Sequence, residues 1–253
     1  MRAFAARIGN TDEPVTFKVV LEDLQKWHES IADEYRSHKE NGTWKPAKLP
    51  PGRKALSTKW VFRIKTNPDS SLRYMSRLVV RGFEQREGID FQETFAPVAK
   101  FPTVRVLLAL ATYFDWEIEQ MDIQTAFLYP TIEEEVYIAV REGYWIFHPD
   151  DKSKAQVFQL VKTLYGLRQS PLIWFKVIDR YLQSKGLMRS NEDTRHYILK
   201  DLIILIFVDD ILLFSVSKEK ILEAKQWLLN EYKKMDQGDL KQFLGMQIFR
   251  DRK

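Results

Sequence analysis

The stretch from Leu202 to Phe214 constrains the fold of this chain most, because it sets two adjacent aspartates between two apolar runs. Each run has the length of a strand, so the pattern predicts two strands joined at Asp209 and Asp210. Aspartate is common in turns, and a plain hairpin turn is one interpretation. Two like charges this close to a core ionise at a cost unless a cation or hydrogen-bond donors compensate. The pattern therefore favours a Mg²⁺ site, because hard divalent ions bind a few carboxylates together with water and phosphate oxygens.

A third carboxylate stands at the end of another expected strand. Residues 116–123 have a strand pattern that ends in Met121-Asp122-Ile123. Three acidic side chains on adjacent strands would suit a two-metal phosphoryl-transfer site. There, one ion activates the attacking 3′-hydroxyl and the other stabilises the leaving pyrophosphate. The alternative is a strand-terminal aspartate with no catalytic part.

Hydrophobic periodicity predicts the rest of an α+β fold. Expected helices cover 21–40, 104–114, 170–186 and 218–233, and further expected strands cover 59–65, 72–81, 196–200, 202–208 and 211–215. The helix over 104–114 is apolar nearly all round and is expected to be buried. Asn41-Gly42 should end the first helix, residues 46–52 should form an irregular connector, and residues 67–70 should form a hairpin turn. The order of strands and helices resembles a split β-α-β layer.

Composition limits the kinds of site that the chain can carry. Its 253 residues are 45% hydrophobic, which allows a substantial core, and its net charge of +4 is compatible with a polyanionic partner without identifying one. The absence of cysteine excludes disulfides, thiolate zinc sites and a cysteine nucleophile. The four His are scattered and match no metal-ligand spacing. No apolar run is long enough to span a bilayer and no signal-peptide pattern is present, so a soluble protein is expected.

Sequence blocks follow one another in a fixed order along the chain. The most specific are QMDIQTAFL at 120–128, LYGLRQSP at 164–171 and FVDD at 207–210. Others are NGTW at 41–44, KWVF at 59–62, RLVVRGF at 77–83, TFAPV at 94–98 and FLG at 243–245. In order and spacing these blocks resemble the reverse transcriptases of Ty1/copia-type LTR retrotransposons, from about Pro14 to the end of the sequence. An aspartate pair alone is weak evidence, whereas this many ordered blocks are strong evidence.

The resemblance implies a right-hand polymerase fold with fingers and a ferredoxin-like split β-α-β palm. The implied reverse transcriptase core spans 1–253: an N-terminal helix and connector (14–58), fingers (59–115 and 131–160), palm (116–130 and 161–235), and primer grip with the start of a thumb (236–253). A full thumb and an RNase H domain are expected to be missing, as in a fragment of a longer polyprotein.

The same resemblance implies site residues. The catalytic, metal-binding carboxylates are Asp122, Asp209 and Asp210, with the Ile123 backbone carbonyl as a further ligand to two Mg²⁺ ions, for which Mn²⁺ could substitute. The implied nucleotide-binding residues are Arg77, Lys59, Lys65, Ala126, Phe127, Tyr165 and Gly166, and the implied primer grip is Phe243, Leu244, Gly245 and Met246. Phe127 is expected to exclude a 2′-hydroxyl by steric clash. The alternative for Phe127 is an ordinary core residue.

Some positions depart from the family pattern. Members usually have Asn-Gly where this chain has Tyr129-Pro130, Arg at Leu172 and Tyr at Phe207. Two main hypotheses follow: an active RNA-directed DNA polymerase, and an impaired or domesticated remnant that only binds nucleic acid. A third is an α+β domain with chance motif matches.

The implied partners are an RNA or DNA template with its primer and deoxynucleoside triphosphates, with no membrane partner. The family further implies integrase upstream and RNase H downstream in the polyprotein, and a cytoplasmic virus-like particle as the location.

Overall fold

The computed structural model describes residues 13–66, 71–141, 143–153, 155–232, 234–244 and 246–252. The chain divides into two compact units: unit 1 is Met1–Gln92 with Thr131–Ser170, and unit 2 is Glu93–Pro130 with Pro171–Lys253. Helices and strands occur in both units, so the predicted α+β class is confirmed. In the part of the chain that the structure describes, no helix has the length and apolar character needed to cross a membrane.

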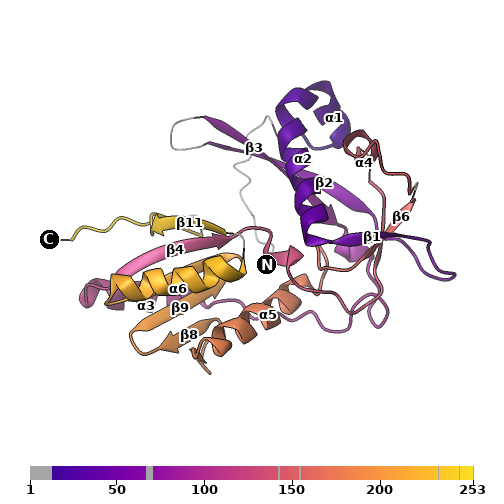
Figure 1. Ribbon diagram of the computed structural model, residues 1–253. Coiled ribbons are helices and arrows are strands. Elements are labelled where there is room, and N and C mark those ends of the chain that lie inside the picture. Colours follow the sequence, from indigo (N-terminus) through magenta and orange to yellow (C-terminus); the bar gives the residue numbers. More distant parts are fainter. Residues whose placement is uncertain are drawn as a thin grey trace, which may run out of the picture. The chain divides into compact units, whose positions relative to one another are not determined.

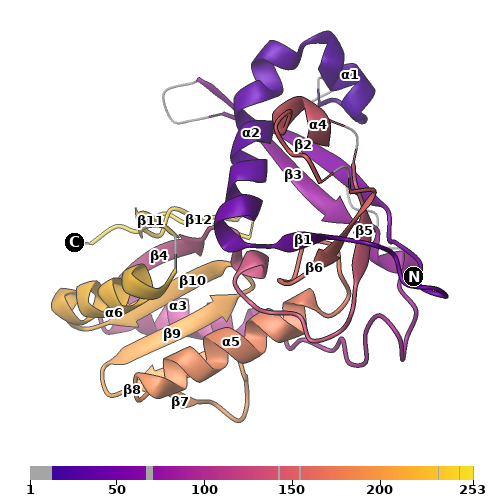
Figure 2. The same cartoon turned by 45° about the vertical axis from the view of Figure 1, so that its right-hand side comes forward.

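Unit 1 combines two small sheets with helices. Its elements are α1 (Phe17–Glu22), α2 (Leu24–Asn41), β1 (Trp44–Ala47), β2 (Thr58–Thr66), β3 (Leu72–Val80), the 3₁₀ turn η1 (Gly82–Glu84), β5 (Tyr137–Ala139), α4 (Tyr144–Phe147) and β6 (Val157–Leu160). The sheets are ordered β1-β6-β5 and β2-β3, and α2 lies against the β2–β3 hairpin (Figures 1 and 2). Trp27 of α2 packs edge-on against Phe62 of β2, with ring centroids 5.0 Å apart.

The predictions for unit 1 hold in the hairpin strands and in most of the connector, and they differ from the structure at the first helix and at the start of the connector. The two hairpin strands are confirmed, whereas their turn, Asn67-Pro68-Asp69-Ser70, lies outside the described residues. Gly42 ends α2 in the left-handed conformation (φ 59°), as predicted. Asp23 separates α1 from α2, so the expected single helix is in fact two. Pro46 and Ala47 of the predicted connector belong to β1, which tolerates Pro46 because β1 is an edge strand. Residues 48–52 contain no helix or strand, as predicted.

Unit 2 is a six-stranded antiparallel sheet with helices on both faces. Its elements are α3 (Phe101–Tyr113), β4 (Glu117–Ile123), the 3₁₀ turn η2 (Ala126–Leu128), α5 (Ser170–Ser184), β7 (Met188–Arg189), β8 (His196–Leu199), β9 (Leu202–Phe207), β10 (Asp210–Ser215), α6 (Lys218–Glu231), β11 (Lys234–Asp239), β12 (Gln242–Phe243) and β13 (Met246–Gln247). The strand order is β11-β4-β10-β9-β8-β7, with β12 and β13 as a separate hairpin. Along the chain, β4-α5-β9-β10-α6-β11 follows the β-α-β-β-α-β pattern of a split layer, as predicted, with β7 and β8 added.

Both faces of the unit 2 sheet are packed, which explains why β9 and β10 are almost continuously apolar. Figures 1 and 2 show α5 and α6 on one face and α3 on the other, and a hydrophobic core lies on each side. Trp174 of α5 belongs to the first core, and Leu107 of α3 to the second. The prediction that α3 is buried on all sides is wrong, because Val106 is 55% and Tyr113 82% exposed. Only one stripe of α3 can meet the sheet.

Candidate functional site

The carboxylates predicted from the sequence gather at one end of the unit 2 sheet. Asp210, the first residue of β10, is the register partner of Asp122 in β4. Directly opposite residues of an antiparallel pair point to the same face, with Cβ atoms about 4.5–5.5 Å apart. The backbone N–H of Ile123 donates to the Asp209 carbonyl oxygen at 2.9 Å, which ties the β9–β10 turn to β4. Two strands far apart in the sequence thus bring the three aspartates to one sheet end.

The turn between β9 and β10 differs by one residue from the predicted one. Phe207 pairs with Asp210, so the turn residues are Val208 and Asp209, and Asp210 belongs to the strand. Two-residue hairpin turns need positive φ angles because of the twist of the strands. Val208 has a φ of 60°. The shift matters, because strand position places the Asp210 side chain on the same face as Asp122.

Gln120 is a site residue that the sequence prediction missed. Its side-chain amide donates to Oδ1 of Asp210 at 3.0 Å. Gln120 lies two residues before Asp122, and this period of two puts both on one face of β4. This spacing of two residues from Asp122 is the sequence feature that could have identified Gln120. Gln120 thus holds one carboxylate oxygen of Asp210 and restrains the orientation of that side chain.

The donor set suits a hard divalent cation. Mg²⁺ prefers one or two carboxylates, with water and phosphate oxygens completing its shell. Among the described residues, no group of three acidic, His or Cys side chains is arranged to hold a metal ion. The strand register instead puts two carboxylates, Asp122 and Asp210, on one face of the sheet, and Asp209 lies on the adjoining turn. The side chain of Ile123 is buried, so its backbone carbonyl, the predicted ligand, is the group that it could offer.

Phe127 follows β4 on the turn η2. Thr125 adopts the left-handed conformation (φ 54°) and redirects the chain after the strand. Ala126 is buried, whereas Phe127 is partly buried and packs against the core beneath α5 and α6. The Phe127 ring therefore has one packed side and some exposed surface, which suits either a steric gate or a peripheral core residue.

In unit 1, the end of β3 lies against the predicted nucleotide-binding segment. The Val80 backbone N–H donates to the Tyr165 carbonyl oxygen at 2.8 Å. The Arg77 guanidinium lies over the Tyr165 ring, 4.6 Å from its centroid. Gly166 has a φ of 92°, and a Cβ there would lie 2.1 Å from the Val80 carbonyl oxygen. Only glycine fits so close to that backbone. The structure thus brings together Arg77, Tyr165 and Gly166.

The predicted lysines occupy the same face of the hairpin as Arg77. Lys59 pairs with Val79, and Lys65 pairs with Arg73. Both lysines are exposed. These basic side chains form one face of the hairpin, opposite the side on which Trp60 and Phe62 are buried.

A buried amide network supports the segment that follows Gly166. Gln85 Nε2 donates to Oε1 of Gln169 at 2.9 Å, and Gln169 Nε2 donates to the Asp90 carbonyl oxygen at 2.8 Å. The Arg168 backbone N–H donates to Oε1 of Gln85 at 2.8 Å. Of these two glutamines only Gln169 lies in one of the sequence blocks, and no local pattern could predict the network, since its partners lie about 80 residues apart.

Of the predicted primer-grip residues, Phe243 and Met246 pair with each other in the β12–β13 hairpin. Phe243 is only 1% exposed and packs edge-on against Phe207, with ring centroids 6.2 Å apart. Leu244 and Met246 pack against the same core, and Gly245 lies outside the described residues. Phe243 therefore anchors the hairpin in the core. A ligand could contact only the backbone and the other side chains of the hairpin.

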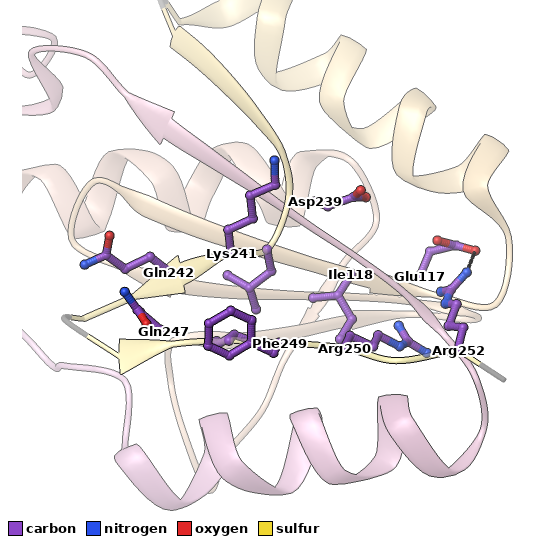
Figure 3. Close-up of a pocket in the computed structure, with 11 residues that line it drawn as sticks. Glu117, Ile118, Asp239, Lys241, Gln242, Gln247, Phe249, Arg250 and Arg252 are labelled. Atoms are coloured by element: carbon purple, nitrogen blue, oxygen red, sulfur yellow. Dashed lines mark hydrogen bonds and ion pairs between the residues drawn. The ribbon is translucent and has the colours of Figure 1, made fainter. Parts of the chain in front are cut away.

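A pocket of about 740 Å³ opens beside this hairpin, between β4 and the C-terminal segment (Figure 3). Arg252 closes one end through its ion pair with Glu117, with 2.7 Å between Nη1 and Oε1. Hydrogen bonding from Arg252 lowers the pKa of the Glu117 carboxyl. Glu117 begins β4, and the five residues from there to Asp122 span about 16 Å at roughly 3.3 Å per residue. Asp122, Asp209 and Asp210 do not line this pocket.

Comparison with known proteins decides the family. A family described as reverse transcriptase (RNA-dependent DNA polymerase) matches residues 41–253. The chain belongs to the reverse transcriptase family. It is 38% identical to the retrovirus-related Pol polyprotein from transposon TNT 1-94 of Nicotiana tabacum, over 97% of this chain and 19% of that protein. It is 32% identical to the Pol polyprotein from transposon RE2 of Arabidopsis thaliana, over 98% of this chain and 17% of that protein.

A more distant similarity reaches the yeast transposons. The transposon Ty1-DR5 Gag-Pol polyprotein of Saccharomyces cerevisiae is 28% identical over 88% of this chain and 12% of that protein. This reverse transcriptase chain thus spans less than a fifth of the length of the two plant relatives. The resemblance to Ty1/copia retrotransposon proteins is confirmed.

The departures from the family pattern are packed into this reverse transcriptase fold. Leu172 is 7% exposed on α5, and Phe207 contacts Phe243. Tyr129 meets Tyr232 edge-on, with ring centroids 5.1 Å apart, and Pro130 is buried. Each departure fills core space, and none removes an aspartate of the site.

Proposed function

We propose that this chain is the polymerase core of an RNA-directed DNA polymerase, which adds deoxynucleotides to a primer 3′ end during retrotransposon replication. The observation that carries the proposal is the register that sets Asp210 opposite Asp122, with Asp209 on the adjoining turn. A carboxylate cluster at a sheet end is the arrangement that two-metal phosphoryl transfer uses. In this proposal the fingers comprise residues 59–115 and 131–160, the palm comprises 116–130 and 161–235, and the β12–β13 hairpin is part of the primer grip.

The proposed catalytic residues act through their negative charge, which would hold metal ions. Asp122, Asp209 and Asp210, with the Ile123 carbonyl, would hold two Mg²⁺ ions, which supply Lewis-acid activation of the attacking hydroxyl and stabilisation of the leaving pyrophosphate. Gln120 orients Asp210 by its hydrogen bond. The aspartates keep the site acidic and oxygen-rich, so that phosphate groups approach it only together with cations.

The proposed nucleotide-binding residues would position the incoming nucleotide. Arg77, Lys59 and Lys65 lie on one basic face and would bind the triphosphate, since guanidinium groups suit phosphate oxygens. The contact of Arg77 with Tyr165 holds the guanidinium in place. Ala126 and Phe127 would border the sugar, and Tyr165 and Gly166 would border the nucleotide and the template base.

A primer-extension assay tests the proposal. The chain, a poly(rA)/oligo(dT) substrate, dTTP and Mg²⁺ should give extended primers, and chelation of the Mg²⁺ should stop extension. Binding of primer-template that weakens with salt, without any extension in Mg²⁺ or Mn²⁺, would instead identify a remnant that only binds nucleic acid.

Replacing Gln120 by Met should lower kcat about fivefold, because the Asp210 carboxylate loses one hydrogen bond worth about 1 kcal/mol and with it a fixed orientation. The Mg²⁺ concentration for half-maximal rate should rise. Gln124→Met is the control, since Gln124 is exposed beyond the end of the same strand. Equal kcat values in the wild type and Gln120→Met would remove Gln120 from the site.

A further inference from the structure

The indole of Trp174 contacts the turn that carries the catalytic aspartates. Trp174 lies on α5 and is fully buried. Its Nε1–H donates to the Val208 carbonyl oxygen at 2.7 Å. The ring itself packs against Tyr232, with centroids 5.4 Å apart. A buried indole N–H needs a partner, and here the partner is a backbone carbonyl immediately before Asp209.

Val208 is held in a conformation that its own side chain disfavours. Its φ is 60°, in the left-handed region that β-branched residues rarely occupy. Hairpin turns that need this region usually place Gly, Asn or Asp there. Such a conformation persists only where the surroundings hold it. The hydrogen bond from Trp174 is a restraint of that kind.

The two carbonyls of the turn are each bound by a different element. Trp174 of α5 donates to the Val208 carbonyl, and the Ile123 N–H of β4 donates to the Asp209 carbonyl. These bonds set the planes of successive peptides, and peptide planes set the direction of the Cα–Cβ bonds between them. If Val208 relaxed to negative φ, Asp209 would point elsewhere while the sheet stayed intact.

We propose that Trp174 is a positioning residue for the catalytic turn, acting through its indole N–H on the Val208 peptide and so on the direction of Asp209 and Asp210. This inference rests on the proposed polymerase function. The competing explanation is a core tryptophan that contributes only packing. The two explanations differ in whether the ring nitrogen matters once the ring volume is kept.

The first experiment is a double-mutant cycle between Trp174→Phe and Val208→Gly, measured by primer extension. Trp174→Phe should lower kcat about fivefold and change the KM for dTTP less than twofold. In the Val208→Gly background, Trp174→Phe should lower kcat less than twofold, because glycine adopts positive φ without restraint. Tyr181→Phe is the control. It removes another hydrogen bond from α5 to a backbone carbonyl, that of Trp227, and should leave kcat near that of the wild type.

A second variant is needed if the cavity left by Trp174→Phe unfolds unit 2. Site-specific replacement of Trp174 by benzothienylalanine keeps the bicyclic ring and puts sulfur in place of the N–H. It should lower kcat about as much as Trp174→Phe. Wild-type kcat in this variant, or an equal loss from Trp174→Phe in both backgrounds, would leave Trp174 a packing residue.

A readout without turnover separates this inference from the proposed function. The Val208 ¹³Cα chemical shift reports its φ, and it should move in the benzothienylalanine variant while the Tyr181→Phe shift matches the wild type. If the wild type binds primer-template but never extends it, the proposed function is wrong. If the Val208 ¹³Cα shift is unchanged in the benzothienylalanine variant, the positioning role of Trp174 is wrong.

Discussion

Asp122→Asn should reduce primer extension at least about a thousandfold, while the protein stays folded and binds primer-template nearly as before. An amide keeps the shape of the side chain but loses the charge that holds Mg²⁺. A thousandfold loss corresponds to about 4 kcal/mol of transition-state stabilisation, which is within what a metal-bound site supplies. Asp209→Asn should have the same effect. The measurements are single-turnover extension rates, thermal unfolding and primer-template binding.

The stability of Asp122→Asn should equal or slightly exceed that of the wild type, because Asp122 and Asp210 are directly opposite and like charges there repel. Asp201→Asn is the matched control: Asp201 lies in the neighbouring β8–β9 turn, 57% exposed, and pairs with Lys220. Its extension rate should stay within about twofold of the wild type, since an exposed ion pair contributes little. Full activity in Asp122→Asn would contradict the assigned catalytic role.

Local pattern was enough to predict the elements that form the site. The runs on either side of Asp209-Asp210 are apolar because β9 and β10 are covered on both faces, and such runs are easily recognised as strands. The register between Asp122 and Asp210 could not be predicted, since it depends on the pairing of strands nearly ninety residues apart. A shift of one residue would turn one of these side chains to the opposite face.

Residues that act through a distant backbone were missed for a physical reason. Trp174 lies in the helix predicted over 170–186 and its ring packs in the core, but its N–H donates to a carbonyl 34 residues away, which no local pattern shows. β1, β5 and β6 were missed because each has only three or four residues, and so short a strand shows little alternation. The exposed stripe of α3 was missed because its residues are apolar on all sides. The extents of fingers and palm remain predictions.

Phe127→Val should raise the use of ribonucleotides relative to deoxynucleotides roughly tenfold or more, because it opens space for a 2′-hydroxyl, and each 1.4 kcal/mol of relieved clash is worth about a factor of ten. Phe127 follows Asp122 by five residues and is only partly buried on η2, so truncation costs little of the core. Use of dCTP should suffer less, mainly from lost packing against the ribose. The measurement is kcat/KM for dCTP and rCTP on one template, with Phe114→Val, an exposed truncation on the far side of the sheet, as control. If the ratio of the two constants is the same in wild type and Phe127→Val, then Phe127 is a core residue and another group selects the sugar.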